Sequence, residues 1–279
     1  MEIEKDYIAY VNELINGDSK SLIGVSLKHN DFSEFPLMTH KKMFTKGVLA
    51  ELLFFLKGQH DNAILVSQGV NIWTQNASQE FKSKNNIHLP DNELGPIYGY
   101  QWRNFNNENI DQLKIIANEL KNKSVSRQLL MSAWCPTMIL KYNKNAEFPM
   151  VLPPCHVSYQ FLYRNNKLHL VMYQRSGDIC LGVPFNIASC GFMLLLLSKY
   201  TGIEPGTLTI NFGDLHIYPE HIEIAKEINN RNIYNGCKVK CNATVYDNFD
   251  EFINNLKISD FEITEYKCND LIKFPLICN

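Results

Sequence analysis

The stretch Asn186-Ile-Ala-Ser-Cys-Gly-Phe-Met-Leu-Leu-Leu-Leu-Ser-Lys-Tyr-Thr201 decides the fold of this chain. It is apolar on nearly every face, which predicts a helix buried at the centre of the protein. Short β-rich segments flank it, at 156–163 and 168–174 before it and at 207–212 after it. Arg164-Asn-Asn-Lys167 is a candidate hairpin turn between the first two segments. Strands combined with segregated helices indicate the α+β class.

Further elements extend outward from this centre. Helices are expected where apolar residues recur at helical spacing or where a proline can open a helix. The expected helices are 6–16, 46–57, 110–121 and 219–231, the further expected strand is 127–134, and the expected loops are 76–92 and 94–103. Because no linker interrupts the 279 residues, we expect a single domain covering 1–279.

Composition and charge argue against several classes of function. The net charge of −2 and the isoelectric point near 6.4 argue against nucleic-acid binding, which needs a clustered basic excess. The charged N-terminus directs no secretion, and the most apolar run, Phe192–Leu197, is too short to cross a membrane, so we expect a cytoplasmic protein. The eight cysteines are then expected to be free thiols. Cys237 and Cys241 have no second ligand pair nearby, so we expect no metal.

One cysteine lies in a context that favours chemistry. Cys155 follows two prolines and precedes His156, and Arg175 comes twenty residues later, inside Tyr173-Gln-Arg-Ser-Gly-Asp178. A thiol, an arginine and a polar cluster are typical of covalent catalysis on an anionic substrate. Glu51 lies inside the apolar helix 46–57, where a carboxylate is costly unless it has partners or a catalytic task. The alternative for Glu51 is a salt-bridged core residue.

Six ordered motifs resemble those of the thymidylate synthase family, from about Phe35 to Tyr266. They are Glu51-Leu-Leu-Phe-Phe-Leu-Lys-Gly, Leu94-Gly-Pro-Ile-Tyr-Gly-Tyr-Gln-Trp-Arg, Leu152-Pro-Pro-Cys-His, Gln174-Arg-Ser-Gly-Asp, Leu181-Gly-Val-Pro-Phe-Asn-Ile-Ala-Ser and Gly213-Asp-Leu-His-Ile-Tyr. Ile72-Trp73 with Asn76, and Gly177, look closer to eukaryotic members. The resemblance implies a large mixed β-sheet with surrounding helices, and a homodimer whose sheets pack back to back.

The resemblance also implies a reaction, in which C5 of dUMP takes a one-carbon unit from 5,10-methylenetetrahydrofolate and the unit is reduced to methyl. Cys155 would add to C6 of the ring, because C5 becomes nucleophilic only after such an addition. Asn186 would bind the O4 and N3 edge and select uracil over cytosine. Glu51 and Tyr98 would relay the C5 proton with ordered water, and His156 would support the polar network around the thiol.

The remaining site residues are also implied by the resemblance. Arg175 would lower the pKa of the thiol and bind the phosphate, and Arg127 would be lent to the neighbouring subunit's phosphate site. The other nucleotide ligands would be Gln174, Ser176, His216 and Tyr218. The folate side would comprise Ile72, Trp73, Asn76, Asp178, Leu181, Gly182 and Phe185, with Asp178 facing the pterin.

The chain departs from the family at the phosphate site and at the C-terminus. Four arginines per site are expected, but Gln128 follows Arg127, and the stretch Leu14–Lys20 contains none. Two missing charge-assisted contacts of about 1.5–3 kcal/mol each would weaken phosphate binding strongly. Lys20 or Lys28 could supply charge, the substrate could differ at its sugar or phosphate, or the chain could be a slow, divergent copy.

The ending Ile272–Asn279 replaces the small-residue terminus that closes over the site in the family. Imperfect closure would admit water and yield 5-hydroxymethyl-dUMP, although the retained Trp73 and Asn186 favour the methyl product. The alternatives are therefore a dUMP hydroxymethylase, a C5-methylating enzyme for another uracil nucleotide, and a non-catalytic nucleotide-binding paralogue. Joint retention of five residues argues against the last, because a binding protein does not need a nucleophile; these are Cys155, Glu51, Tyr98, Asn186 and Asp178.

Overall fold

A six-stranded mixed sheet forms the centre of the computed structural model, which describes residues 1–277. Its strands are β1 Ser21–Ile23, β2 Ser26–His29, β3 Leu130–Ser132, β4 His156–Arg164, β5 Lys167–Asp178 and β6 Glu204–His216. The order is β1-β6-β5-β4-β3, with β2 also paired to β6, and β5 and β6 form the parallel pair. Parallel neighbours need a crossover, and α8 (Gly182–Thr201) supplies it.

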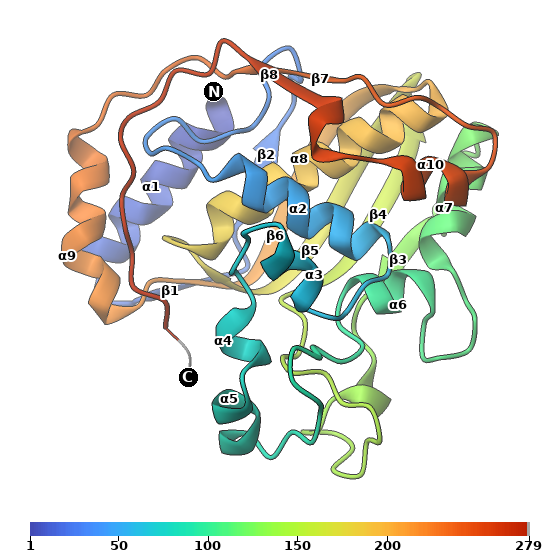
Figure 1. Cartoon of the computed structure of the whole chain (residues 1–279). Helices are drawn as coiled ribbons and strands as arrows, with labels where there is room; N and C mark the ends of the chain where they lie inside the picture. The colour runs from blue at the N-terminus through green and yellow to red at the C-terminus, as the bar shows by residue number, and fades with distance from the viewer. Residues whose placement is uncertain (278–279) are drawn as a thin grey trace.

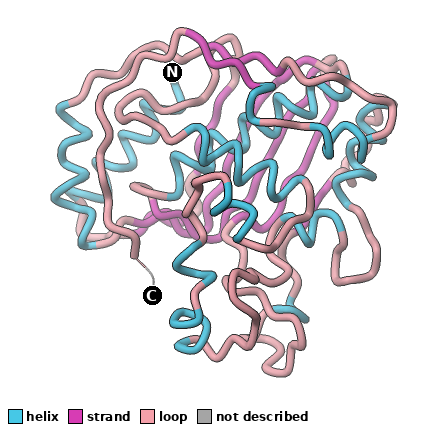
Figure 2. The backbone as a smooth tube through the Cα atoms, viewed as in Figure 1, coloured by secondary structure: helices cyan, strands magenta, loops and turns pink. Residues whose placement is uncertain are grey.

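Helix α8 is the buried central helix that the sequence predicts. It lies between the sheet and α2 (Thr45–Leu56), as Figures 1 and 2 show. It begins at Gly182, about one turn before the predicted start, and it ends at Thr201. The next residue, Gly202, has a φ of 69°, the left-handed cap conformation that glycine adopts readily. At 20 residues α8 is long and apolar enough to cross a membrane, but most of it is buried inside the fold, as expected of a core helix.

The other elements surround this centre. The remaining helices are α1 Glu2–Asn16, α3 Ala63–Ser67, α4 Thr74–Ala77, α5 Gln79–Lys84, α6 Gly99–Arg103, α7 Gln112–Lys121, α9 Ile222–Ala225 and α10 Phe249–Asn255. Short 3₁₀ helices occupy Pro136–Met138, Pro219–His221, Lys226–Asn230 and Ile258–Asp260. A separate two-stranded sheet pairs β7 (Lys238–Cys241) with β8 (Phe261–Thr264). The predicted α+β class is confirmed.

The register of the sheet separates a covered face from an open one. The row of Met131, Tyr159 and Met172 is buried under the helices. The neighbouring row contains Leu130, which is 49% exposed, and Tyr173 on the same face is 44% exposed. Adjacent residues of a strand point to opposite faces, so these exposed apolar side chains mark the face that no helix within residues 1–277 covers.

Several predicted boundaries were wrong, for local reasons. The predicted loop 76–92 overlaps the end of α4 and contains α5, which is capped by the Ser78 side chain accepting a hydrogen bond from the Phe81 amide. The predicted loop 94–103 ends in α6. The helix predicted at 219–231 is instead two 3₁₀ turns with α9 between them. The hairpin turn is confirmed: Asn165 and Asn166 have φ values of 52° and 59°, which suit a type I′ turn.

Candidate active site

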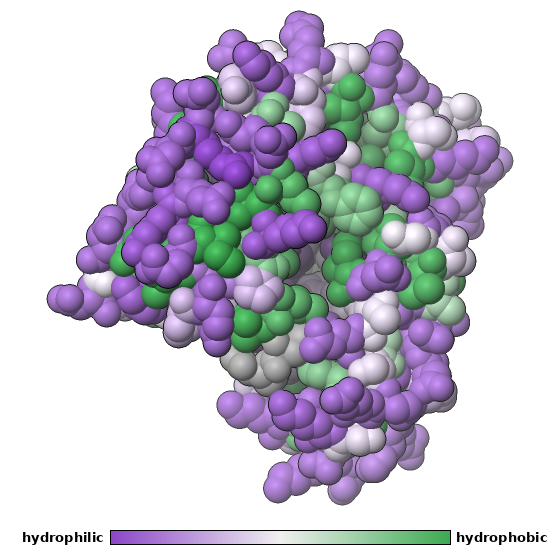
Figure 3. Space-filling model, turned by 60° about the vertical axis from the view of Figure 1, so that its left-hand side comes forward, coloured by the Kyte–Doolittle hydropathy of each residue, from purple (hydrophilic) through white to green (hydrophobic). Residues whose placement is uncertain are grey.

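A cavity of about 180 Å³ opens where β4 begins, β5 ends and α8 begins, and α2 forms its opposite wall. Its lining combines a thiol, two carboxyl groups, two amides and several rings. The lining residues are Glu51, Phe55, Trp73, Tyr98, Cys155, His156, Gln174, Ser176, Asp178, Gly182 and Asn186. Figure 3 shows a face of the molecule that is largely hydrophilic, with apolar residues gathered around a central hollow.

Cys155 is held in place by its backbone. Its amide donates to the Tyr98 hydroxyl at 3.0 Å, and its carbonyl accepts from the Arg175 amide at 2.9 Å. The Arg175 guanidinium donates to the carbonyls of Pro154 (3.1 Å) and Pro153 (2.9 Å), and its Nη2 lies 3.9 Å from the Cys155 sulfur. Burial raises the pKa of the thiol, and the Arg175 charge opposes that rise. The two prolines thus fix the cation beside the sulfur.

Glu51 faces the thiol region from α2. Its Oε1 accepts a hydrogen bond of 2.7 Å from the Trp73 indole N–H. Burial raises the pKa of Glu51 to about 7, although the Trp73 bond acts in the opposite direction. A carboxyl group with this pKa can both give and take a proton at neutral pH, which is what general acid–base chemistry requires.

Tyr98 stands in a strained turn next to Glu51. Its φ of 21° is unusual for a residue with a side chain, and such strain costs about 1–3 kcal/mol and concentrates at functional sites. Gly99 follows because the chain passes very close to α2: a Cβ there would lie 2.1 Å from the carbonyl oxygen of Phe55. Because this residue is a glycine, the loop can approach α2 closely, and the Tyr98 ring packs against Phe55 with ring centres 4.9 Å apart.

An uncharged polar network forms the floor of the cavity. Gln174 Nε2 donates to Asn186 Oδ1 at 2.9 Å and to the Ser176 carbonyl at 3.0 Å. His156 Nδ1 and the Tyr159 hydroxyl are 2.9 Å apart. Burial lowers the pKa of His156 to about 4, despite its bond to Asn186, so this imidazole is neutral at physiological pH. The network orients the Asn186 amide without placing a charge beside it.

Asp178 ends β5 and shapes the turn into α8. Its Oδ1 accepts from the amides of Cys180 (3.0 Å) and Leu181 (3.4 Å). Of the residues predicted for the folate side, Trp73, Asp178 and Gly182 line the cavity. The others, Ile72, Asn76, Leu181 and Phe185, do not line it.

The predicted phosphate and sugar ligands are dispersed. His216 is the last residue of β6 and Tyr218 follows the strand; their ring centres are 5.1 Å apart, outside the cavity lining. Arg127 is exposed just before β3, and its carbonyl accepts from Gln160. The Lys20 ammonium donates to three backbone carbonyls at the end of α1, at 2.8–3.3 Å. In this geometry Lys20 caps a helix.

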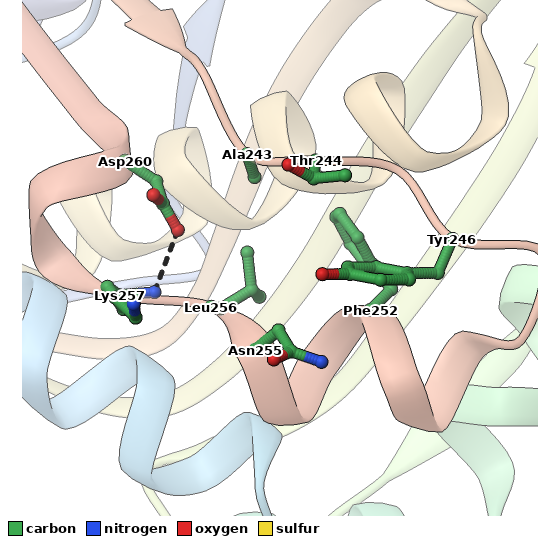
Figure 4. A pocket seen from close by; sticks show the side chains of 8 residues that line it. All are labelled: Ala243, Thr244, Tyr246, Phe252, Asn255, Leu256, Lys257 and Asp260. Atoms are coloured by element: carbon green, nitrogen blue, oxygen red, sulfur yellow. Dashed lines mark hydrogen bonds between the residues drawn. The ribbon is translucent and has the colours of Figure 1, made fainter.

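Sequence reasoning missed three aromatic residues of the site. Phe55 lines the cavity, Tyr159 holds His156, and the Trp134 ring lies 5.9 Å from the Arg175 guanidinium carbon. All three read as ordinary core residues, and the chain offers no local signal that distinguishes them. Another hollow, shown in Figure 4, is lined by aromatic and polar residues such as Tyr246, Phe252 and Lys257, and no thiol lines it.

The cavity brings a thiol together with a fixed guanidinium, a buried carboxyl group and an oriented amide, an arrangement that is typical of enzymes with a cysteine nucleophile. Comparison with known proteins identifies the family. The thymidylate synthase family profile matches residues 15–278.

Similar proteins that carry a name support the same family. The chain is 36% identical over 275 residues to the thymidylate synthase of Phytoplasma mali, covering 91% of this chain and 90% of that protein. It is 38% identical over 265 residues to the Saccharomyces cerevisiae thymidylate synthase, covering 87% and 82%. It is 37% identical to the bifunctional dihydrofolate reductase-thymidylate synthase of Paramecium tetraurelia, of which it spans 55%. The chain belongs to the thymidylate synthase family of methyltransferases, which use methylenetetrahydrofolate as co-substrate.

Proposed function

We propose that this chain methylates C5 of dUMP to give dTMP, with 5,10-methylenetetrahydrofolate as one-carbon donor and reductant. The observation that carries the proposal is the single cavity that holds the Cys155 thiol beside Arg175, opposite Glu51 and Tyr98. A binding protein has no use for a nucleophile placed among proton-exchanging groups. When bound, the folate supplies the methylene carbon and then a hydride, and leaves as dihydrofolate.

The chain's own residues perform the other steps. The Cys155 thiolate adds to C6, and Arg175 stabilises that thiolate. Charge develops on O4 as the adduct forms, and the Asn186 amide, fixed by Gln174, donates to it. Glu51, with its pKa near 7, receives the C5 proton with Tyr98 and water, and the bond from C6 to sulfur then breaks.

Binding roles complete the proposal. Asp178 faces the pterin, and Ile72, Trp73, Asn76, Leu181, Gly182 and Phe185 line the folate side. Gln174, Ser176, His216 and Tyr218 hold the nucleotide, with Arg175 at the phosphate and His156 in the supporting network. We place the reaction in the cytoplasm.

We further propose a homodimer in which the open sheet face is the interface. The exposed Leu130 and Tyr173 on that face would be buried, and the exposed Arg127 would reach the partner's phosphate site. Each site then needs two chains. Mixing Cys155→Ala protein with Arg127→Ala protein should therefore restore about a quarter of wild-type activity, since half of the dimers are mixed and each mixed dimer holds one intact site. No gain after demonstrated subunit exchange would contradict the shared site.

The direct test is to incubate the protein with dUMP and methylenetetrahydrofolate, and to follow dihydrofolate absorbance and the nucleotide mass. Dihydrofolate with dTMP supports the proposal. A hydroxymethyl nucleotide without dihydrofolate would make the chain a hydroxymethylase, and no product would refute both. Cys155→Ala should abolish turnover but retain dUMP binding, whereas Cys190→Ala, at a buried thiol outside the cavity, should keep turnover.

A further inference from the structure

A second cysteine lies in a mixed polar cluster beneath the C-terminal segment. Ligand atoms of Asp178, Cys180 and His221 all lie within 4.8 Å of one another. Cys180 and His221 are fully buried, and Asp178 is partly exposed where it lines the Cys155 cavity. A carboxylate, a thiol and an imidazole rarely share a buried site without a reason, because each is costly to desolvate alone.

The hydrogen bonding of His221 leaves one ring nitrogen available. Its Nε2 lies 2.8 Å from the Pro275 carbonyl oxygen, which can only accept, so Nε2 carries a hydrogen. In a neutral imidazole Nδ1 then holds a lone pair. That Nδ1 lies 3.4 Å from Asp178 Oδ1 and, within residues 1–277, forms no hydrogen bond. Asp178 Oδ1 already accepts from the Cys180 and Leu181 amides, so the buried Nδ1 lone pair is the group that lacks a donor, and a proton or a metal ion between the two atoms would supply it.

We propose that Asp178, Cys180 and His221 form a binding site for a zinc ion. Thiolate, imidazole and carboxylate are the three ligand types that Zn²⁺ takes in proteins, and ligand atoms of a tetrahedral site lie about 3.3–3.7 Å apart. The His221–Asp178 pair already has that separation, and the thiol, which lies within 4.8 Å of both, has to approach by at most about 1.5 Å.

The surroundings fit such an ion. The His221 Nε2–H bond to a backbone carbonyl is the outer partner that metal-binding histidines usually have, and it fixes the ring orientation. One carboxylate and one thiolate balance the charge of a divalent ion, and the thiol proton leaves to solvent on binding. Asp178 connects the cluster to the cavity, which gives the ion and its remaining water ligand a route from solvent.

Lys41 is the cation that opposes binding. Its ammonium donates to the Cys180 carbonyl at 2.6 Å and lies 5.2 Å from the Phe274 ring centre. Its charge lowers the affinity for a cation, so the site should bind zinc reversibly. The consequence for catalysis, which rests on the proposed function, is that zinc withdraws Asp178 from the pterin and inhibits competitively with the folate.

The test measures metal binding without substrate, so it does not depend on the proposed reaction. Zn²⁺ is titrated calorimetrically into wild-type protein, Cys155→Ala, Cys180→Ala and His221→Gln. Cys155→Ala removes the other cavity thiol and should still bind one ion per chain. Cys180→Ala and His221→Gln should lose more than the roughly 10- to 100-fold in affinity that an outer partner costs.

Absence of stoichiometric binding, its persistence in Cys180→Ala or its loss in Cys155→Ala would overturn the proposal. Thermal unfolding without metal checks that the variants are folded. If Cys180→Ala does not fold, Co²⁺ decides: the Cys155→Ala protein should show a thiolate-to-cobalt absorption band, and adding His221→Gln should remove it. A missing band, or one that survives His221→Gln, rejects the site.

Discussion

Replacing Glu51 by glutamine should stabilise the protein at alkaline pH while impairing catalysis. The carboxyl group lies in the apolar helix α2, where burial raises its pKa from 4.5 to about 7. Glutamine has the same shape, and its amide oxygen can still accept the 2.7 Å bond from Trp73. The substitution therefore removes the ionisation and little else.

The size of the expected change in the free energy of unfolding follows from the pKa shift of Glu51. The folded state keeps its Glu51 proton at pH values where the unfolded chain has lost it. Stability from this group is therefore full below pH 4.5 and falls as the pH rises toward 7. A pKa difference of about 2.5 units corresponds to about 3 kcal/mol. The carboxyl group lines an open cavity, so solvent reduces this value, and about 3 kcal/mol is the upper limit for Glu51→Gln at pH 8.

Urea unfolding at pH 5 and pH 8, at one fixed protein concentration, measures the effect in both proteins. The wild type should lose stability between the two pH values relative to Glu51→Gln, and the variant should turn over dUMP much more slowly at both. If the free energies of unfolding of the two proteins change in parallel with pH, Glu51 does not titrate in this range. Its assignment as a neutral-pH proton carrier would then be wrong.

Three further predictions concern the Arg175 cation beside the thiol, the contact of Asn186 with the uracil ring, and the binding of the substrate phosphate. Arg175→Lys should slow alkylation of Cys155 by iodoacetamide about tenfold at neutral pH. A lysine lacks the planar fork that binds both proline carbonyls, so its charge is not fixed beside the sulfur. An unchanged alkylation rate would show that the guanidinium does not lower the pKa of the thiol. Asn186→Asp should shift turnover from dUMP toward dCMP in a competition assay, and an unchanged preference would contradict its role at the base. Lys20→Met should cost up to about 1 kcal/mol in urea unfolding by removing the α1 cap, with the KM for dUMP unchanged; a strongly raised KM would make Lys20 a phosphate ligand.

The fold could be predicted where its signal is local. The apolar stretch of α8 and the Asn165–Asn166 turn are visible in a few consecutive residues, and both are confirmed. Helix α5 was missed because its stability rests on the Ser78 cap and on burial of Phe81, which a polar stretch does not display. The helix after Pro219 was overextended because helical spacing does not show where tertiary contacts replace α-helical turns by 3₁₀ turns.

The site could be predicted only through its motifs. Residues from five of the six motifs meet at one cavity, so the quoted stretches anticipated Cys155, Glu51, Tyr98 and Asn186 together. No spacing rule places Cys180 beside His221, because their proximity arises from the meeting of a strand end with the turn after β6. Such clusters belong to the tertiary structure, and a sequence read alone leaves them as unrelated core residues.

The arrangement of positive charge suggests why a second chain matters. Two donor groups of Arg175 are held by proline carbonyls, and the same guanidinium lies beside the thiol that we propose it helps to ionise. A phosphate dianion bound there would neutralise the charge that stabilises the thiolate. Lys20 is occupied at the end of α1 and does not relieve this competition. If the partner's Arg127 shares the phosphate with Arg175, less of the Arg175 charge is neutralised, and the same guanidinium can bind the phosphate and still stabilise the thiolate.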